Sequence, residues 1–228
     1  MTRPGPVESL SCSQAREMSG LASWVAPPGC PRLRAYNLLL TSADGRVRRE
    51  LAVKHSTEVA VNSYLLAGLF PATQYSLTLT AVCVFETLQS ESETEVAQFC
   101  SLPAPPTNLS LETRAPTSLT VRWDPAPSPA PALRYRLSIT ATELNFAADH
   151  SVPGDRTTFQ FSKLPEVLGT GIGYCVKVES VATPVGAETE VVSTPLTDTF
   201  TTKPLPPHNF QTSGQCISFS RSPTPAVR

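Results

Sequence analysis

Cysteine and histidine are the side chains of this chain with the most specific chemistry. Closely spaced pairs of them bind zinc, and two cysteines in an oxidising compartment form a disulfide bond. No Cys-x-x-Cys pair occurs and the histidines stand alone, so the spacing argues against a zinc site. The six cysteines are Cys12, Cys30, Cys83, Cys100, Cys175 and Cys216, and the three histidines are His55, His150 and His208.

Disulfide bonds are the chemistry that the cysteine positions favour. Four cysteines lie in the first hundred residues, and they permit three pairings between which the sequence does not choose. Cys175 stands alone in an apolar, strand-like run, and we expect it to be a buried free thiol. Cys216 lies in a Ser/Pro-rich end segment, where it would be available for pairing between molecules.

Asn108 begins the triplet Asn-Leu-Ser, a candidate N-glycosylation site that indicates the same secretory compartment. The N-terminus lacks the apolar run of a secretory signal. The most apolar windows, 64–70 and the run that ends at Phe85, are far shorter than the roughly 20 residues that span a bilayer. We therefore expect a piece of a longer extracellular or cell-surface precursor, with no signal peptide, membrane helix or membrane insertion of its own.

No segment resembles a nucleophile elbow, a phosphate loop or a metal motif, so we expect no catalytic residues and no cofactor. The 18 basic and 19 acidic residues give a net charge of -1, which argues against a nucleic-acid partner. Asp44-Gly45-Arg46 and Gly154-Asp155-Arg156 contain the residues of the Arg-Gly-Asp adhesion tripeptide in another order. We interpret both as hairpin turns.

An internal repeat sets the elements that must position these residues. Trp24 is followed by a tyrosine after 12 residues and by another after 39 more, and Trp123 is followed by two tyrosines at the same spacings. The two tryptophans lie 99 residues apart, about the length of one small β-sandwich. Proline-rich junctions at 103–109 and 204–210 punctuate the copies, and the second begins a third copy that soon ends. The repeated aromatic residues are Trp24, Tyr36 and Tyr75 in the first copy and Trp123, Tyr135 and Tyr174 in the second.

Apolar residues alternate with polar ones within each copy, which is the period of a β-strand. Several short alternating runs separated by turns predict an all-β chain whose copies are two-sheet sandwiches. The 23 prolines interrupt nearly every window long enough for a helix. The predicted inward sets are Leu119, Val121 and Trp123; Tyr135, Leu137 and Ile139; Phe159 and Phe161; and Tyr174, Val176 and Val178, with counterparts in the first copy.

The order Pro-Pro-x-Asn-Leu, Ser-Leu-Thr-Val-Arg-Trp-Asp-Pro, Tyr-Cys-Val-Lys-Val and Thr-Phe-Thr-Thr-Lys-Pro resembles a fibronectin type III domain at 103–203. Residues 7–102 resemble a second one through Leu-Phe-Pro-Ala-Thr-Gln-Tyr. The resemblance implies immunoglobulin-like sandwiches, with 1–6 as a disordered N-terminus and 204–228 as a truncated, partly disordered third repeat. The chain is similar to the ectodomains of cell-surface receptors and adhesion proteins, including those of receptor-type tyrosine phosphatases.

The resemblance also implies roles for individual residues. The tryptophans and tyrosines of the repeat form the two cores, and Tyr75 and Tyr174 are similar to the tyrosine whose hydroxyl bonds nearby backbone. Cys30 and Cys83 would approach at one pole, leaving Cys12 and Cys100 for each other or free. The implied function is a non-enzymatic extracellular protein-interaction or adhesion module within a larger receptor. A structural spacer and an intracellular scaffold remain alternatives.

Overall fold

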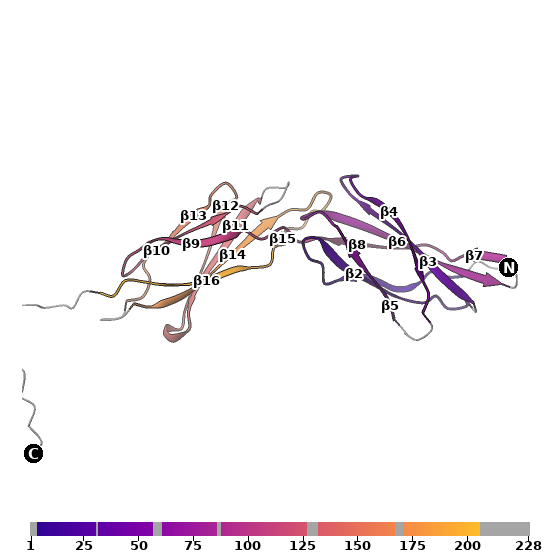
Figure 1. The fold of residues 1–228 in the computed structure, drawn as a ribbon, viewed down its shortest axis with the longest axis horizontal. Helices are drawn as coiled ribbons and strands as arrows, with labels where there is room; N and C mark the ends of the chain where they lie inside the picture. Colours follow the sequence, from indigo (N-terminus) through magenta and orange to yellow (C-terminus); the bar gives the residue numbers. More distant parts are fainter. Residues whose placement is uncertain are drawn as a thin grey trace, which may run out of the picture.

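Two β-sandwiches follow one another along the chain in the computed structural model (Figure 1), which describes residues 4–30, 32–56, 61–85, 88–126, 132–166 and 171–205. The first sandwich contains β1 (Glu8–Ser13), β2 (Ser19–Val25), β3 (Leu33–Ser42), β4 (Arg48–Lys54), β5 (Val61–Ala67), β6 (Gln74–Phe85), β7 (Leu88–Glu91) and β8 (Glu95–Cys100). The second contains β9 (Thr107–Arg114), β10 (Leu119–Asp124), β11 (Arg134–Ala141), a 3-10 turn (Thr142–Leu144), β12 (Phe146–Pro153), β13 (Thr158–Phe161), β14 (Gly173–Ala182), β15 (Val191–Val192) and β16 (Leu196–Thr201). The all-β class and the tandem sandwiches predicted from the sequence are confirmed.

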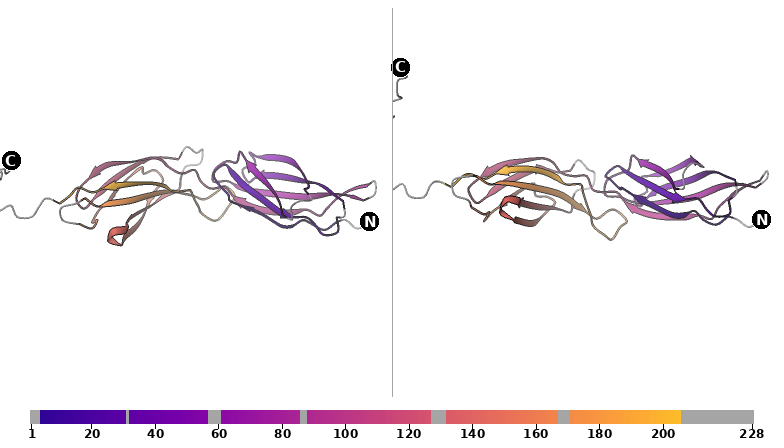
Figure 2. Two further views of the ribbon diagram at one scale, coloured as in Figure 1. Left: turned by 60° about the horizontal axis from the view of Figure 1, so that its bottom comes forward. Right: turned by 90° about the horizontal axis from the view of Figure 1, so that it is seen from below.

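Both sandwiches have the same two antiparallel sheets, which Figure 2 shows as two layers. A three-stranded sheet has the order β1-β2-β5 in the first sandwich and β9-β10-β13 in the second. The opposite sheet has the order β4-β3-β6 in the first and β12-β11-β14 in the second. The last strand of each repeat is split, so β7 and β8 both pair with β6, and β15 and β16 both pair with β14.

A serine accounts for the split in each repeat. The Ser92 amide donates to the Ala81 carbonyl at 2.8 Å, and the Ala81 amide donates back to Ser92 Oγ at 2.8 Å. Ser193 and Ser180 make the same exchange, both at 2.9 Å. The side chain thus replaces one carbonyl of the ladder, and the strand continues beyond an interruption without leaving buried backbone groups unpaired.

Strand alternation places the core between the sheets of each sandwich. Trp24 and Trp123 are fully buried, as are the four tyrosines that share their spacing, Tyr36, Tyr75, Tyr135 and Tyr174. The strands that carry these residues alternate buried and outward positions, as in the burial of every second residue of β2, except near the ends of β6 and β14, where consecutive residues are buried. One hydrophobic cluster therefore fills each sandwich, and the clusters do not merge across the junction.

The segment between β14 and β15 contacts the first sandwich. Val185 forms an isolated bridge with Thr73, its amide donates to the Ala72 carbonyl, and its carbonyl accepts from the Gln74 amide, both at 3.4 Å. Thr194 Oγ1 also donates to a carboxylate oxygen of Glu17 at 2.8 Å. Hydrogen bonds of backbone and side chain therefore join the two repeats outside the linker.

Two expectations from the sequence need correction. Residues 4–6, expected in a disordered N-terminus, are held because Pro4 is buried and its carbonyl accepts from the Glu93 amide at 3.0 Å. Gly154-Asp155 is a turn but not a hairpin, since it joins β12 to β13, which belong to opposite sheets. Residues 206–228, with Cys216 and most of the predicted third repeat, lie outside the described residues.

Candidate protein-interaction surface

The predicted aromatic residues form the scaffold that holds the surface. Trp24 meets Tyr36 edge to face, with ring centroids 5.1 Å apart, and Trp123 meets Tyr135 in the same way at 5.3 Å. Such edge contacts match the ring quadrupoles and add to the free energy of burial. All four residues are buried at the centre of a sandwich, so they are structural and leave no aromatic surface for stacking a ligand.

Tyr75 and Tyr174 hold equivalent corners. Tyr75 Oη accepts a hydrogen bond from the Phe70 amide at 2.7 Å, and Tyr174 Oη donates to the Pro165 carbonyl at 3.1 Å. Burial raises the pKa of both phenols, so they stay protonated across the physiological range. These bonds tie the chain before β6 and β14 to the strand that follows.

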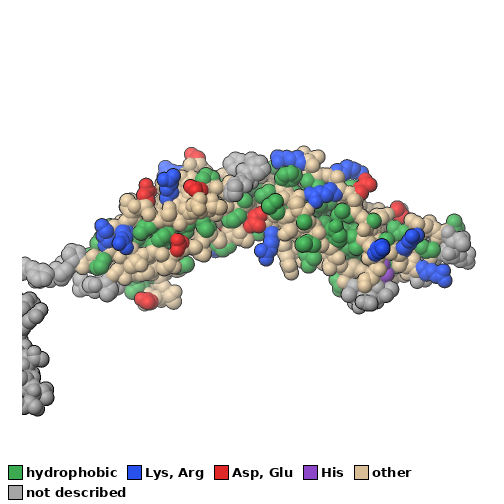
Figure 3. All heavy atoms as spheres, viewed as in Figure 1, with side chains coloured by type: hydrophobic (Ala, Val, Ile, Leu, Met, Phe, Trp, Pro, Cys, Tyr) green, Lys and Arg blue, Asp and Glu red, His purple; other side chains and the backbone are tan. Residues whose placement is uncertain are grey.

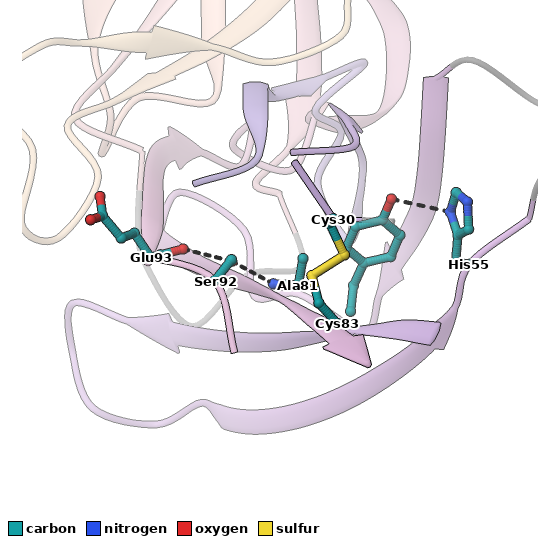
Figure 4. The surroundings of a disulfide bond; sticks show 7 residues. Cys30, His55, Ala81, Cys83, Ser92 and Glu93 are labelled. Atoms are coloured by element: carbon teal, nitrogen blue, oxygen red, sulfur yellow. Dashed lines mark hydrogen bonds between the residues drawn. A yellow bond between two sulfur atoms is a disulfide. The ribbon is translucent and has the colours of Figure 1, made fainter. Parts of the chain in front are cut away.

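Cys30 and Cys83 form a disulfide bond at one pole of the first sandwich (Figure 4), with Cα atoms 5.7 Å apart. Cys30 lies in the loop after β2, and Cys83 lies late on β6. The bond thus crosslinks the loop that joins β2 to β3 with β6, an inner strand of the larger sheet. Close by, the Tyr36 hydroxyl and His55 Nδ1 are hydrogen-bonded at 3.3 Å.

Three other cysteines among the described residues are free thiols. Cys12 and Cys100 do not pair with each other, which leaves the free alternative for both. Burial raises the pKa of Cys12 to about 11 and that of Cys100 in the same direction. Cys175 was expected to be buried, and this was wrong: it is exposed, because its neighbours Tyr174 and Val176 take the inward positions of β14.

Asn108 lies exposed near the start of β9 with a left-handed backbone φ of 55°. Asparagine tolerates this conformation better than most residues. Its Nδ2 atom, which would carry a glycan, donates to a carboxylate oxygen of Asp124 at 2.7 Å. The predicted glycosylation position is therefore at the surface of the second sandwich.

A groove lies on the outer face of the larger sheet in the first sandwich. Its floor combines polar and apolar side chains and contains no Lys or Arg. Asn37 and Leu39 from β3 lie beside Thr80 and Thr78 from β6. The Asn37 amide Nδ2 donates to a carboxylate oxygen of Glu91 at 3.0 Å. The lining is Asn37, Leu38, Leu39, Glu50, Leu51, Ala52, Thr78, Thr80 and Glu91.

The second sandwich has a groove at the equivalent place, but its lining is charged. Lys177 pairs with Glu179 at 2.9 Å, and Arg134 makes a two-pronged ion pair with Glu190, one contact of which measures 2.6 Å. The hydrogen bonds between these two side chains raise the pKa of Arg134 and lower that of Glu190. The lining is Arg134, Arg136, Ser138, Asp149, His150, Ser151, Lys177 and Glu179.

Sequence reasoning missed both grooves, although a signal for them exists in the repeat. Positions 99 residues apart are equivalent on these strands, since Trp24 matches Trp123 and the tyrosines keep the same offset. At that offset Asn37 matches Arg136, and Thr78 matches Lys177. Comparing the outward positions of the two copies would have shown where the repeats diverge.

Charge is otherwise spread over the molecule. Figure 3 shows Lys and Arg side chains interspersed with Asp and Glu over the visible face of both sandwiches. Across the described ranges, no three His, Cys, Asp or Glu side chains gather where they could hold a metal ion. No helix in the same ranges is long and apolar enough to cross a bilayer.

Comparison with known proteins finds a family match for the second repeat. The Fibronectin type III domain family matches residues 104–197. Human netrin receptor DCC is 33% identical over 128 residues, which are 55% of this chain and 8% of the receptor. Human neogenin is 27% identical over 190 residues, which are 78% of this chain and 12% of neogenin. The chain thus spans a small part of the length of these relatives.

A solved structure shows the same fold. It is a segment of two fibronectin type III domains from chicken tenascin, which superposes with a TM-score of 0.53 at 22% sequence identity. The superposition covers 86% of this chain and 99% of the tenascin segment. The likeness extends over both sandwiches, including the first, which lies outside the residues matched by the family.

Proposed function

We propose that this chain, a tandem pair of fibronectin type III domains, is a non-enzymatic protein-interaction module in the ectodomain of a larger cell-surface receptor. One observation carries the proposal: two grooves occupy equivalent places on a repeated scaffold and present different side chains. Loops and sheet surfaces of such scaffolds are where recognition is built, because the core leaves them free to vary.

The packing explains why the groove side chains are free for recognition. Inward positions are occupied by the same kinds of residue in both repeats, with Trp24 matched by Trp123 and Tyr36 by Tyr135. Outward positions on the same strands differ in charge, with Asn37 matched by Arg136. Since the fold forms with either side chain, the fold does not require the charge at this position.

Arg136 is the side chain in the second groove that we assign to partner contact. It is exposed on β11, and no ion pair involves it among the described residues. Arg134 beside it is already held by Glu190. After the hydrogen bonds from Arg134, the charge of Arg136 also helps to lower the pKa of Glu190, but no ion pair in the described ranges holds the Arg136 guanidinium in place. A guanidinium offers five hydrogen-bond donors in a fixed fork, which suits a carboxylate on the surface of a partner protein.

Netrin is the first ligand to test, since the DCC relative is a netrin receptor. Surface plasmon resonance with the immobilised chain should give saturable netrin binding that Arg136→Glu weakens by about tenfold or more, equivalent to ~1.4 kcal/mol. Arg122→Glu is the matched control, because Arg122 is exposed on β10 of the opposite sheet in the same domain. Binding that ignores Arg136, or no saturable binding, would count against the proposal.

The compartment can be tested by mass. For protein isolated from its native source, we expect a mass loss on glycosidase treatment at Asn108 and one disulfide, between Cys30 and Cys83. Asn108→Gln should remove the glycosidase effect and leave the disulfide. Free thiols at every cysteine together with an unmodified Asn108 would instead support the intracellular scaffold.

A structural spacer is the second candidate function, and the contacts between the repeats favour it. Val185 bridges to Thr73, and Thr194 bonds to Glu17, so the repeats are joined by more than a linker. A spacer would tolerate changes in both grooves and would respond to a change in its length. A recognition module would show the opposite pattern: it would respond to changes in the grooves and tolerate a change in its length.

A further inference from the structure

Among the described residues, Glu8, opposite Val25, is the one charged side chain at a strand-paired position on the outer face of the sheet β1-β2-β5. Leu65 and Val61 are exposed at 62% and 55%. Serine fills most of the other outward places. Besides Glu8, the outward residues are Ser11, Ser13, Ser19, Leu21, Ser23, Val25, Val61, Ser63, Leu65 and Ala67.

The second repeat shows that the fold does not need this apolar face. Leu21 opposes Leu65 in the first sandwich, whereas the equivalent pair in the second is Thr120 with Gln160. Ser23 opposes Ser63, whereas its equivalent, Arg122, opposes Thr158. Polar residues thus serve the same sheet positions in the second sandwich, so folding does not require the half-buried Leu21 and the exposed Leu65 to be apolar.

β5 is also an edge strand. It pairs with β2, and no other strand among the described residues pairs with it. The Arg49 guanidinium on β4 donates to the carbonyl oxygens of Ala67, at 2.6 Å, and Gly68, so the Ala67 carbonyl points away from β2. Because these directions alternate along a strand, the backbone groups of Ser63 and Leu65 also point to the open edge.

Length and composition leave that edge open to pairing. β5 has seven residues with no proline and no charge, whereas its counterpart β13 has four. Natural edge strands avoid pairing through shortness, prolines, charges or a cover. Within the described part of the chain, Arg49 covers β5 at its Ala67 end, and no hydrogen bond covers the edge at Ser63 or Leu65.

We propose that a second copy of this chain pairs with β5, strand to strand and antiparallel, about a two-fold axis at Ser63. In that register Ser63 faces Ser63 of the second copy, and Val61 faces Leu65 of the second copy. The sequence of the exposed side, Val-Ser-Leu, is thereby self-complementary, with apolar against apolar and no like charges opposed. One patch serves both copies, as a two-fold interface requires, and the two sheets, whose outer faces are uncharged on β2 and β5, join into one six-stranded sheet.

Sedimentation of the whole chain, with free thiols alkylated so that no disulfide links two molecules, tests the pairing. We expect a concentration-dependent dimer whose dissociation constant rises by about tenfold or more in Leu65→Lys, a change of ~1.4 kcal/mol. The matched control is Gln160→Lys, which places the same charge at the equivalent position of the second sandwich. The Leu65 side chain is exposed, so the melting temperature should stay near that of the parent.

A second variant separates the edge from the face. Ser63→Pro removes a backbone donor that points to the open edge and leaves the Trp24–Asn62 and Ala22–Tyr64 ladder pairs in place. We expect it to abolish the dimer while both sandwiches still unfold cooperatively. A monomeric parent, or a dimer unchanged by both Leu65→Lys and Ser63→Pro, would overturn the proposal. Neither outcome bears on the groove at Arg136, which lies in the other domain.

Discussion

Arg136 occupies the position in the second sandwich that Asn37 occupies in the first. Asn37 lies between Ala52 of β4 and Thr80 of β6, and Arg136 lies between Ser151 of β12 and Glu179 of β14. Each points outward into a groove on the larger sheet of its own sandwich. One scaffold therefore presents a neutral amide at one end of the molecule and a cation at the other.

Removal of Trp123 should unfold one sandwich selectively. Trp123→Ala deletes the largest side chain of a close-packed core and should lower the free energy of unfolding of the second domain by about 3–5 kcal/mol. Denaturant unfolding followed by circular dichroism should then show two separate transitions, because the first sandwich has its own core. A variant that unfolds in one transition at the parent's midpoint would contradict this assignment.

Thiol reactivity should follow exposure and pKa. Iodoacetamide at about pH 8 should modify Cys175 well before Cys12, because the thiolate is the nucleophile and burial holds the pKa of Cys12 at about 11. Peptide mass spectrometry over a time course measures the order. Cys175→Ser should remove the fast adduct and leave the slow one. Modification of Cys12 first would refute the half-buried position of its thiol.

Gly186 should couple the two sandwiches. Its backbone φ is +89°, and a Cβ atom there would lie 2.4 Å from the Ala43 Cβ atom of the first sandwich. Gly186→Ala should therefore separate the repeats, so that their amide ¹⁵N relaxation reports two rotational correlation times instead of one. Gly29→Ala is the control, since Gly29 has a φ of +75° but open space around the added atom. Equal relaxation in parent and Gly186→Ala would contradict the contact.

Asp44 should make the β3–β4 turn sensitive to acid. Ser42 Oγ donates to its carboxylate at 2.6 Å, and Arg46 pairs with it at 3.0 Å. The hydrogen bond from Ser42 is the largest of the effects that lower the pKa of Asp44 below its usual value. The stabilisation is therefore present above the unfolded pKa of roughly 4 and is lost as pH falls through the lower folded pKa.

Asp44→Asn tests that dependence. The melting temperature of the variant should lie below that of the parent at about pH 6, and the difference should shrink as pH falls toward ~2, where the parent carboxylate is protonated. Melting curves by circular dichroism across that range measure it. A difference that stays constant or grows on acidification would show that the charge of Asp44 is not involved.

The cores were predictable from the sequence because burial repeats with the period of a strand. Trp24, Tyr36 and Tyr75 needed only alternation and the repeat spacing to be placed inside. Cys175 was wrongly predicted to be buried because its surroundings are apolar. Its position between Tyr174 and Val176, both predicted to point inward, indicated an outward side chain.

The open edge and the side-chain contacts in the grooves were not predictable, since they depend on which strands lie side by side. Asn37 meets Glu91 across 54 residues of chain, and Arg134 meets Glu190 across 56. The contact of Val185 with Thr73 joins the two domains, which the repeat pattern treats as separate units. The choice of strand partners and the docking of the domains are set by the folded chain and leave no period in the sequence.

The most direct test of the proposed recognition surface is a netrin titration of the immobilised parent, Arg136→Glu and Arg122→Glu proteins by surface plasmon resonance. The groove at Arg136 predicts saturable binding to the parent and to Arg122→Glu, with affinity lower by about tenfold or more for Arg136→Glu. Equal affinity for all three proteins, or no saturable binding to the parent, would contradict the groove as the site of netrin recognition.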